Sequence, residues 1–261
     1  AIQVSASEQK EEVVADNKAQ IEELFKGQTS VFLAVSSTQN QPFVGQGFTL
    51  KFSLFIPDDN STRYSFDRND IQIPALIQKI RPKNCWEESF GLQEVKVSKV
   101  VYKNKNYTEY RFFQASYFSL DNHLIRIPAL NFRVKQVSPG KGLERQVKNV
   151  YFKSAPFVIS PKALPVHPLA GKVPVGNFKL IESVSQKSIK TGQSVTYQTR
   201  LVGDGNSILW DNKEVESDYF VNFTPVSAER SVVPIRDQMI GQKVDIFKIS
   251  PEQPGQISLG K

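Results

Sequence analysis

Apolar and polar residues alternate along much of the chain, which is typical of β-strands with one buried face. In the run GFTLKFSLF, which begins at residue 47, every second residue from Phe48 to Leu54 is apolar and the residues between them are polar. Further β-rich runs, each bounded by turn formers, occupy residues 29–37, 92–102, 107–118, 123–137 and 149–160. No helical pattern of about 10 to 15 residues separates them, as a parallel α/β fold would require. The pattern predicts an all-β chain of immunoglobulin-like sandwiches.

One of these strands has a counterpart later in the chain. Residues 44–54 read VGQGFTLKFSL and residues 191–201 read TGQSVTYQTRL, so that the Gly-Gln pair at 45–46 recurs 147 positions later. Glycine before each strand suits a turn, because it reaches positive φ without a Cβ clash. We interpret the two runs as one β module used twice in tandem, in which the glycine motif is architecture.

A proline-rich segment separates the two copies. It reads SPKALPVHPLAGKVPVG at residues 160–176 and holds four prolines, which stiffen an extended chain and cannot donate to a sheet ladder. We predict a linker at 165–174 between one immunoglobulin-like sandwich at 29–164 and a second at 175–261. The end, QPGQISLGK, stops as a strand-like stretch begins, which favours an excised fragment with a truncated second sandwich.

The first 28 residues form a leader of different texture. Residues 7–25, SEQKEEVVADNKAQIEELF, are rich in helix-forming residues and place Ile21, Leu24 and Phe25 at roughly helical spacing. A short helix and a solvated leader are both compatible with this pattern, because one weak apolar stripe buries little surface. The leader lacks the basic and apolar regions of a signal peptide, and no run approaches the roughly 20 apolar residues of a membrane helix.

Composition indicates a folded protein and leaves its partners open. The chain is 39% hydrophobic, too apolar for a disordered chain. Its net charge of +7 permits an acidic partner without naming one. Basic residues gather between Arg133 and Lys153, but the rings near them alternate as core residues do, so we predict no nucleic-acid binding. The members of this basic group are Arg133, Lys135, Lys141, Arg145, Lys148 and Lys153.

Candidate chemistry is sparse. The two histidines, His123 and His167, have no second His or Cys at metal-ligand spacing. Cys85 is the single cysteine, so it leaves the cellular compartment open; a catalytic thiol would need a base such as His123 nearby, and a half-buried loop thiol is the alternative.

Two acidic clusters could offer oxygen ligands to calcium, or they could be solvated loop charges. They are Asp58-Asp59-Asn60 and Asp67-Arg68-Asn69-Asp70, and Arg63 and Arg68 argue against a cation site. No nucleotide-binding loop, nucleophile elbow or zinc-protease pattern occurs. We therefore predict no enzymatic activity, no catalytic residue, no cofactor and no metal site, and we leave the partner-binding residues open.

Several features in order make the chain resemble the BatD family of the bacterial aerotolerance operon, also called the oxygen tolerance family. The resemblance covers about residues 30 to 261 and does not extend to residues 1–28. The features are Ser154-x-Pro156, Leu164-Pro165, Val175-Gly176-Asn177-Phe178, Thr191-Gly192-Gln193 and Gly203-x-Gly205-Asn206, together with VVYKNKNYTEYRFFQASYFSLDNHLIRIPAL in the first module.

The resemblance implies tandem immunoglobulin-like modules on the periplasmic side of the cytoplasmic membrane, anchored by a segment outside this chain. It also implies von Willebrand A-type-domain membrane proteins as partners. The expected function is a non-enzymatic protein-interaction and assembly component of a Bat-type complex for oxidative or envelope stress. The alternative is a carbohydrate- or calcium-binding β-sandwich module.

Overall fold

The computed structural model of the chain describes residues 21–28, 30–66, 69–92, 94–139, 145–205 and 221–256. They are mostly strands in antiparallel sheets, so the predicted all-β class is confirmed. Two compact units are present. Unit 1 comprises Ala1–Gln41, Phe48–Tyr117 and His123–Pro161, and unit 2 comprises Pro42–Gly47, Phe118–Asn122 and Lys162–Lys261.

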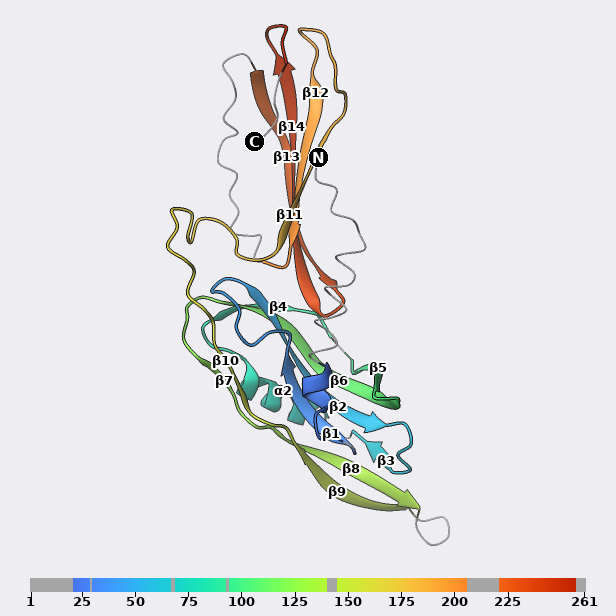
Figure 1. Cartoon of the computed structure of the whole chain (residues 1–261). Coiled ribbons are helices and arrows are strands. Elements are labelled where there is room, and N and C mark those ends of the chain that lie inside the picture. Colours follow the sequence, from blue (N-terminus) through green and yellow to red (C-terminus); the bar gives the residue numbers. More distant parts are fainter. Residues whose placement is uncertain are drawn as a thin grey trace. The chain divides into compact units, whose positions relative to one another are not determined.

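Unit 1 holds most of the elements (Figure 1). These are β1 (Phe32–Ser37), β2 (Gly47–Pro57), β3 (Arg63–Ser65), α2 (Asn69–Ile80), β4 (Cys85–Ser89), β5 (Lys96–Tyr102), β6 (Lys105–Ser119), β7 (Ile125–Ile127), β8 (Asn131–Pro139), β9 (Arg145–Lys153) and β10 (Phe157–Ile159). The main sheet has the order β1-β2-β6-β4, and β5 pairs with another part of β6. The order β3-β8-β9 forms a second sheet, and β10 pairs with β7.

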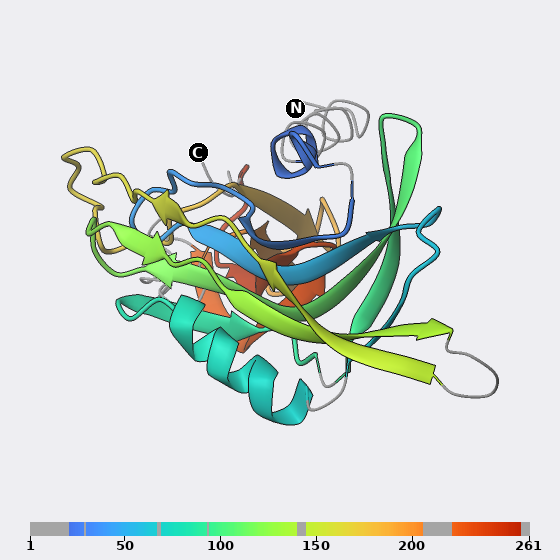
Figure 2. The same cartoon turned by 90° about the horizontal axis from the view of Figure 1, so that it is seen from below.

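The core of unit 1 lies between these sheets. The alternating apolar face of β2 packs there with the inward residues of β6 and β8, and Leu50, Phe52 and Phe132 have no exposed surface. Burying each such side chain contributes roughly 1.5 to 3 kcal/mol. Leu76 and Ile80 of α2 join the same cluster. In Figure 2, α2 lies on one side of the main sheet and the helical turn at residues 21–25 lies on the other.

Sequence analysis missed α2, because the run before it was interpreted as an acidic loop. Ile73, Leu76, Ile77 and Ile80 do follow helical spacing, and all four pack into the core of unit 1. Pro74 within the helix and the polar residues before it hid this pattern. Asp70 therefore belongs to the first turn of a helix and not to a loop.

The helical turn at 21–25 attaches the leader to the outer face of the main sheet. Phe25 is 1% exposed and its ring lies 4.8 to 5.1 Å from the rings of Phe32, Phe55, Tyr102 and Tyr107. Residues 21–25 at the end of the leader are helical, and residues 1–20 lie outside the described residues.

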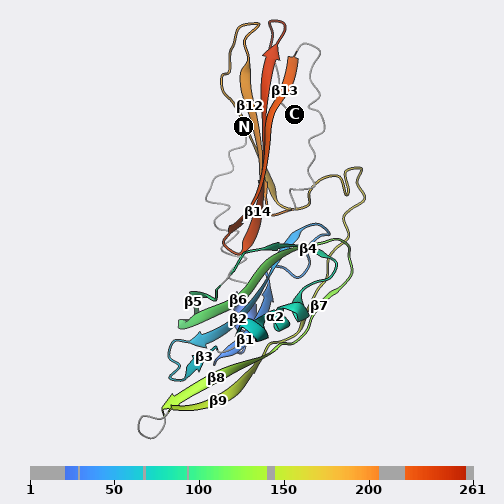
Figure 3. The same cartoon turned by 180° about the vertical axis from the view of Figure 1, so that it is seen from behind.

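Unit 2 contains one sheet within the described residues, with the order β11-β12-β14-β13 (Figure 3). Its strands are β11 (Phe178–Val184), β12 (Val195–Gly203), β13 (Val221–Ile235) and β14 (Gln238–Pro251). One face carries a buried cluster that includes Tyr197, Phe247 and Ile249. No helix of the described chain is both long enough and apolar enough to cross a bilayer.

The two runs that are similar in sequence also have the same geometry. Leu33 of β1 pairs with Leu54 of β2, and Leu180 of β11 pairs with Leu201 of β12, at the same offset. Gly45 has a φ of 83° and Gly192 a φ of 85°, in the left-handed region that glycine tolerates best. We call β1, its turn and β2 the first repeat, and β11, its turn and β12 the second repeat.

Candidate functional site

The main candidate site is a hollow at one end of unit 2. Its walls are the turn between β11 and β12 and the chain that follows β14. The lining residues are Val184, Gln186, Lys187, Ser188, Ile189, Lys190, Thr191, Val195, Ile249, Pro251, Gln253, Pro254, Gly255 and Gln256. The hollow encloses about 760 Å³, and ligand pockets typically span about 300 to 1,000 Å³.

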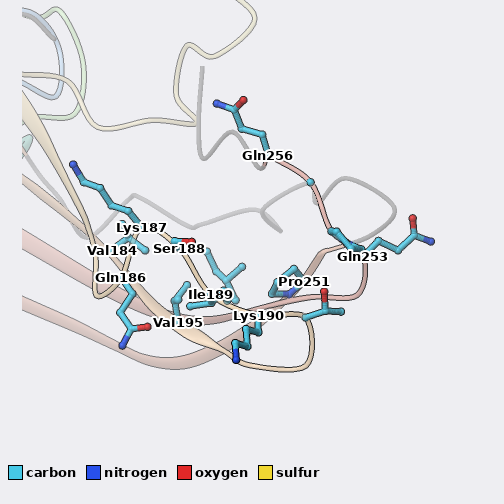
Figure 4. A pocket seen from close by; sticks show the side chains of 14 residues that line it. Val184, Gln186, Lys187, Ser188, Ile189, Lys190, Val195, Pro251, Gln253 and Gln256 are labelled. Atoms are coloured by element: carbon cyan, nitrogen blue, oxygen red, sulfur yellow. The ribbon is translucent and has the colours of Figure 1, made fainter.

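The hollow has an apolar floor and a cationic rim. Val195 and Ile249 at the floor belong to the buried cluster of the sheet, and Ile189 packs against that cluster. Figure 4 shows Ile189, Val195 and Pro251 close together, while Lys187 and Lys190 extend away from them. No carboxylate lines the hollow in the described part of the chain. The lining therefore suits an apolar group flanked by negative charge.

Hydrogen bonds hold the rim in one conformation. The N–H of Gln193 donates to the carbonyl of Lys190 at 3.0 Å, and the side-chain oxygen of Gln193 accepts from the N–H of Lys190 at 3.1 Å. The N–H of Thr196 donates to the hydroxyl of Ser185 at 3.0 Å. With Gly192 at positive φ in the third position, this is the pattern of a type II turn. Such a preformed turn loses little conformational entropy when a partner binds.

A buried tyrosine supports the floor. The hydroxyl of Tyr197 donates a hydrogen bond to the carboxylate of Glu182 on the neighbouring strand β11. Burial is the main cause that raises the pKa of Tyr197 above its usual value, and the negative charge of Glu182 adds to it. Tyr197 is therefore neutral at physiological pH and acts as a hydrogen-bond donor.

The histidines and Cys85 are not gathered into a metal site. His167 lies in the proline-rich segment, where its Nδ1 accepts from the N–H of Leu169 at 3.1 Å. Cys85 lies on β4, half-buried against the core of unit 1. Across the described ranges, no three His, Cys, Asp or Glu side chains are grouped closely enough to hold a metal ion.

The carboxylates of the first acidic cluster are engaged by lysines. Asp58 accepts from Nζ of Lys99 at 2.8 Å and from the hydroxyl of Thr108 at 2.8 Å. The hydrogen bond from Lys99 is the largest cause that lowers the pKa of Asp58. Asp59 lies 3.3 Å from Nζ of Lys105. Asp67 and Arg68 of the second cluster lie outside the described residues.

The basic group divides between the two faces of the β8–β9 ribbon. Arg133 lies opposite Tyr151, and Lys135 opposite Asn149, on the face turned away from the core. Lys153 belongs to this face by its register, and Lys148 belongs to the other. Lys141 and the side chain of Arg145 lie outside the described residues. The ribbon offers one exposed ring, Tyr151, and not a row of stacked aromatics.

Sequence analysis also missed a buried ion pair on β6. Nη2 of Arg111 lies 2.9 Å from Oε2 of Glu109, and both side chains are less than one-tenth exposed. The hydroxyls of Ser53 and Ser98 donate to the same carboxylate at 2.7 and 2.9 Å. Burial alone would raise the pKa of Glu109, but its hydrogen bonds and the charge of Arg111 outweigh burial and lower it. The two-residue spacing in TEYRFF was the available signal, because it places both charges on one face of a strand.

The protein is therefore an all-β chain with a hollow of apolar floor and cationic rim at one end of unit 2. Comparison of the chain with protein-family models, with curated proteins and with solved structures finds no match.

Proposed function

We propose that the protein is a non-enzymatic protein-interaction and assembly component whose unit 2 binds partner proteins through strand pairing. The observation that carries this proposal is β13, which forms one edge of its sheet and runs for 15 residues. Most of its side chains are exposed, and no strand pairs with its outer side within the described residues. An edge strand offers unpaired N–H and C=O groups that can accept a partner strand.

Two prolines define the part of β13 that is suited to pairing. Pro225 and Pro234 cannot donate hydrogen bonds, and proline on an edge strand blunts pairing at its position. The window between them, residues 226–233, reads VSAERSVV. Its eight residues are enough to pair with a strand of the common length of about five or six residues.

The charges in this window disfavour pairing between two copies of the protein. Two copies of the protein that pair through β13 in antiparallel orientation would be related by a two-fold axis perpendicular to the sheet. One residue of the window would then lie directly opposite the same residue of the other copy. In registers centred on Glu229 or Arg230, like charges would face each other, which is destabilising. Pairing between two copies is therefore disfavoured in these two registers, and a strand from a different protein avoids both.

The resemblance to the BatD family suggests which proteins supply that strand. We propose von Willebrand A-type-domain membrane proteins of a Bat-type aerotolerance complex, met on the periplasmic side of the cytoplasmic membrane. In this proposal the protein is anchored by a segment outside the present chain. The net charge of +7 would add attraction to an acidic partner surface.

Copurification with the A-type-domain protein, expressed from the same operon, tests this proposal. We expect Val226→Lys with Val233→Lys to reduce recovery at least tenfold, because charge on an edge opposes strand addition. The control is Val97→Lys with Val101→Lys on β5, whose side chains are 58% and 62% exposed, against 62% and 43% for the β13 pair. Failure of the unaltered chain to recover any such protein, or an equal loss in the control, would contradict the proposal.

A further inference from the structure

The first repeat has a third strand partner, and the second repeat has no such partner among the residues that the structure describes. In the first repeat, residues 160–162 run beside residues 40–44. The N–H groups of Ser160 and Lys162 donate to the carbonyls of Asn40 and Pro42 at 2.8 and 2.7 Å, and the N–H of Val44 donates to the carbonyl of Lys162 at 2.9 Å. Phe43 and Lys162 form a parallel bridge. The chain itself therefore occupies this strand position in the first repeat.

The corresponding position in the second repeat is the wall of the hollow. Adding the offset of 147 converts residues 40–44 into residues 187–191, which line it. In the first repeat the paired groups are the carbonyls of Asn40 and Pro42 and the N–H of Val44. Their counterparts in the second repeat are the carbonyls of Lys187 and Ile189 and the N–H of Thr191. Within the described residues, none of these three groups makes a hydrogen bond.

The apolar floor shows the same correspondence. Ile159, next to the pairing segment, is fully buried in the cluster that contains Phe48. The counterpart of Phe48 in the second repeat is Val195, a smaller residue at the floor of the hollow. Figure 4 shows Val195 beside Ile189, where an apolar side chain would find an apolar surface on two sides.

The rim differs between the repeats in charge. Asn40 and Phe43 of the first repeat are replaced by Lys187 and Lys190 in the second, and both lysines are exposed. These two cations, with no carboxylate among the described lining residues, favour a segment that carries acidic side chains. The segment at 160–162, which is paired with the first repeat, carries Lys162 and lacks this complementarity.

We propose that the hollow is an acceptor site for an extended acidic segment of another protein, which runs parallel to residues 187–191 and buries one β-branched apolar side chain against Val195. This inference names a kind of partner for the interaction function proposed above and rests on that proposal. It concerns a different surface from the edge of β13, so the two can fail separately.

Labelled peptides test the acceptor site. The probe is PFVISPKA, residues 156–163, with Lys162→Glu, which would place a carboxylate at the position that faces Lys190. Fluorescence polarisation with the full 261-residue chain should show saturable binding of this probe. The affinity should be about fivefold higher than for the unaltered peptide, because replacing a like charge by an opposite charge contributes about 1 kcal/mol. The same probe with Ile159→Asp should not bind. No saturable binding of the Lys162→Glu peptide would overturn the proposal.

Two variants of the chain locate the binding. Thr191→Pro removes the N–H of Thr191, which is the proposed hydrogen-bond donor, so we expect about fivefold weaker peptide binding. Thermal unfolding should be unchanged, because this position of the turn favours proline. The double variant Lys187→Asn, Lys190→Gln should weaken peptide binding by a similar factor. The control is Lys179→Gln with Lys248→Gln, which changes the net charge equally at exposed sites outside the hollow and should leave peptide binding unchanged. Equal losses in both lysine pairs would overturn the proposal. If the peptide fails while the β13 variant still abolishes copurification, the acceptor site is wrong and the interaction function stands.

Discussion

Glu109 and Arg111 show how a charged pair can be kept inside the protein. Two hydroxyls and a bidentate guanidinium satisfy the carboxylate, so its charge is compensated where water is excluded. Such a pair contributes little net stability, but the loss of one partner leaves a buried charge uncompensated.

We expect Arg111→Leu to lower the free energy of unfolding by about 3 to 5 kcal/mol. The double variant Glu109→Leu, Arg111→Leu should recover most of this loss, because no charge remains buried. Urea denaturation of the three proteins measures both effects. A double variant no more stable than the single one would contradict this explanation.

The same carboxylate makes stability depend on pH. Because the folded-state pKa of Glu109 lies below the ordinary value of 4.5, the unfolded chain binds more protons in this range. The contribution of Glu109 is therefore complete above pH 4.5 and is lost as pH falls through its folded-state pKa. Urea denaturation between about pH 3 and pH 6 should show a smaller decline for Glu109→Gln than for the unaltered chain.

At the scale of elements, alternation in the sequence predicted β1, β2, β5, β6 and β12. The predicted runs at 123–137 and 149–160 each contain two strands, and the long strands β13 and β14 were not predicted. The helix α2 was missed, since Pro74 and neighbouring polar residues resemble a loop. The hollow was also missed, because its walls bring together residues of 184–195 and 249–256, which are distant in the sequence. Pairing between distant segments is set by the folded topology and leaves no local pattern in the sequence.

Phe25 is the most deeply buried side chain of the helical turn at 21–25, where Ile21 and Leu24 pack against the same cluster. Phe25→Ala should lower the free energy of unfolding by about 3 to 5 kcal/mol, since it empties a space enclosed by four rings. Glu23→Ala, on an exposed position of the same turn, should change it by less than about 0.5 kcal/mol. Chemical denaturation measures both, and equal effects would show that Phe25 is not the anchor.

At the scale of the whole molecule, the two units differ in how much core they possess. In the described part of the chain, the main cluster of unit 1 holds seventeen buried residues and the cluster of unit 2 holds five. Regions with fewer buried apolar contacts open at lower free energy.

Hydrogen exchange should therefore differ between the units. We expect the amides of β2 and β6 to exchange more slowly than those of β12 and β14, although all four strands have neighbours on both sides. Mass spectrometry of peptides from the four strands provides the measurement. Equal protection of the four strands would contradict this expectation.

The pairing of residues 160–162 with residues 40–44 bears on the stoichiometry of the proposed acceptor site. Two open turns of this kind would make a chain bivalent and able to cross-link partners into a network. Because residues 160–162 already occupy the turn of the first repeat, only the turn of the second repeat is open among the described residues. Under the proposal each molecule would take up one acidic segment there, so this site would cap an assembly and not branch it.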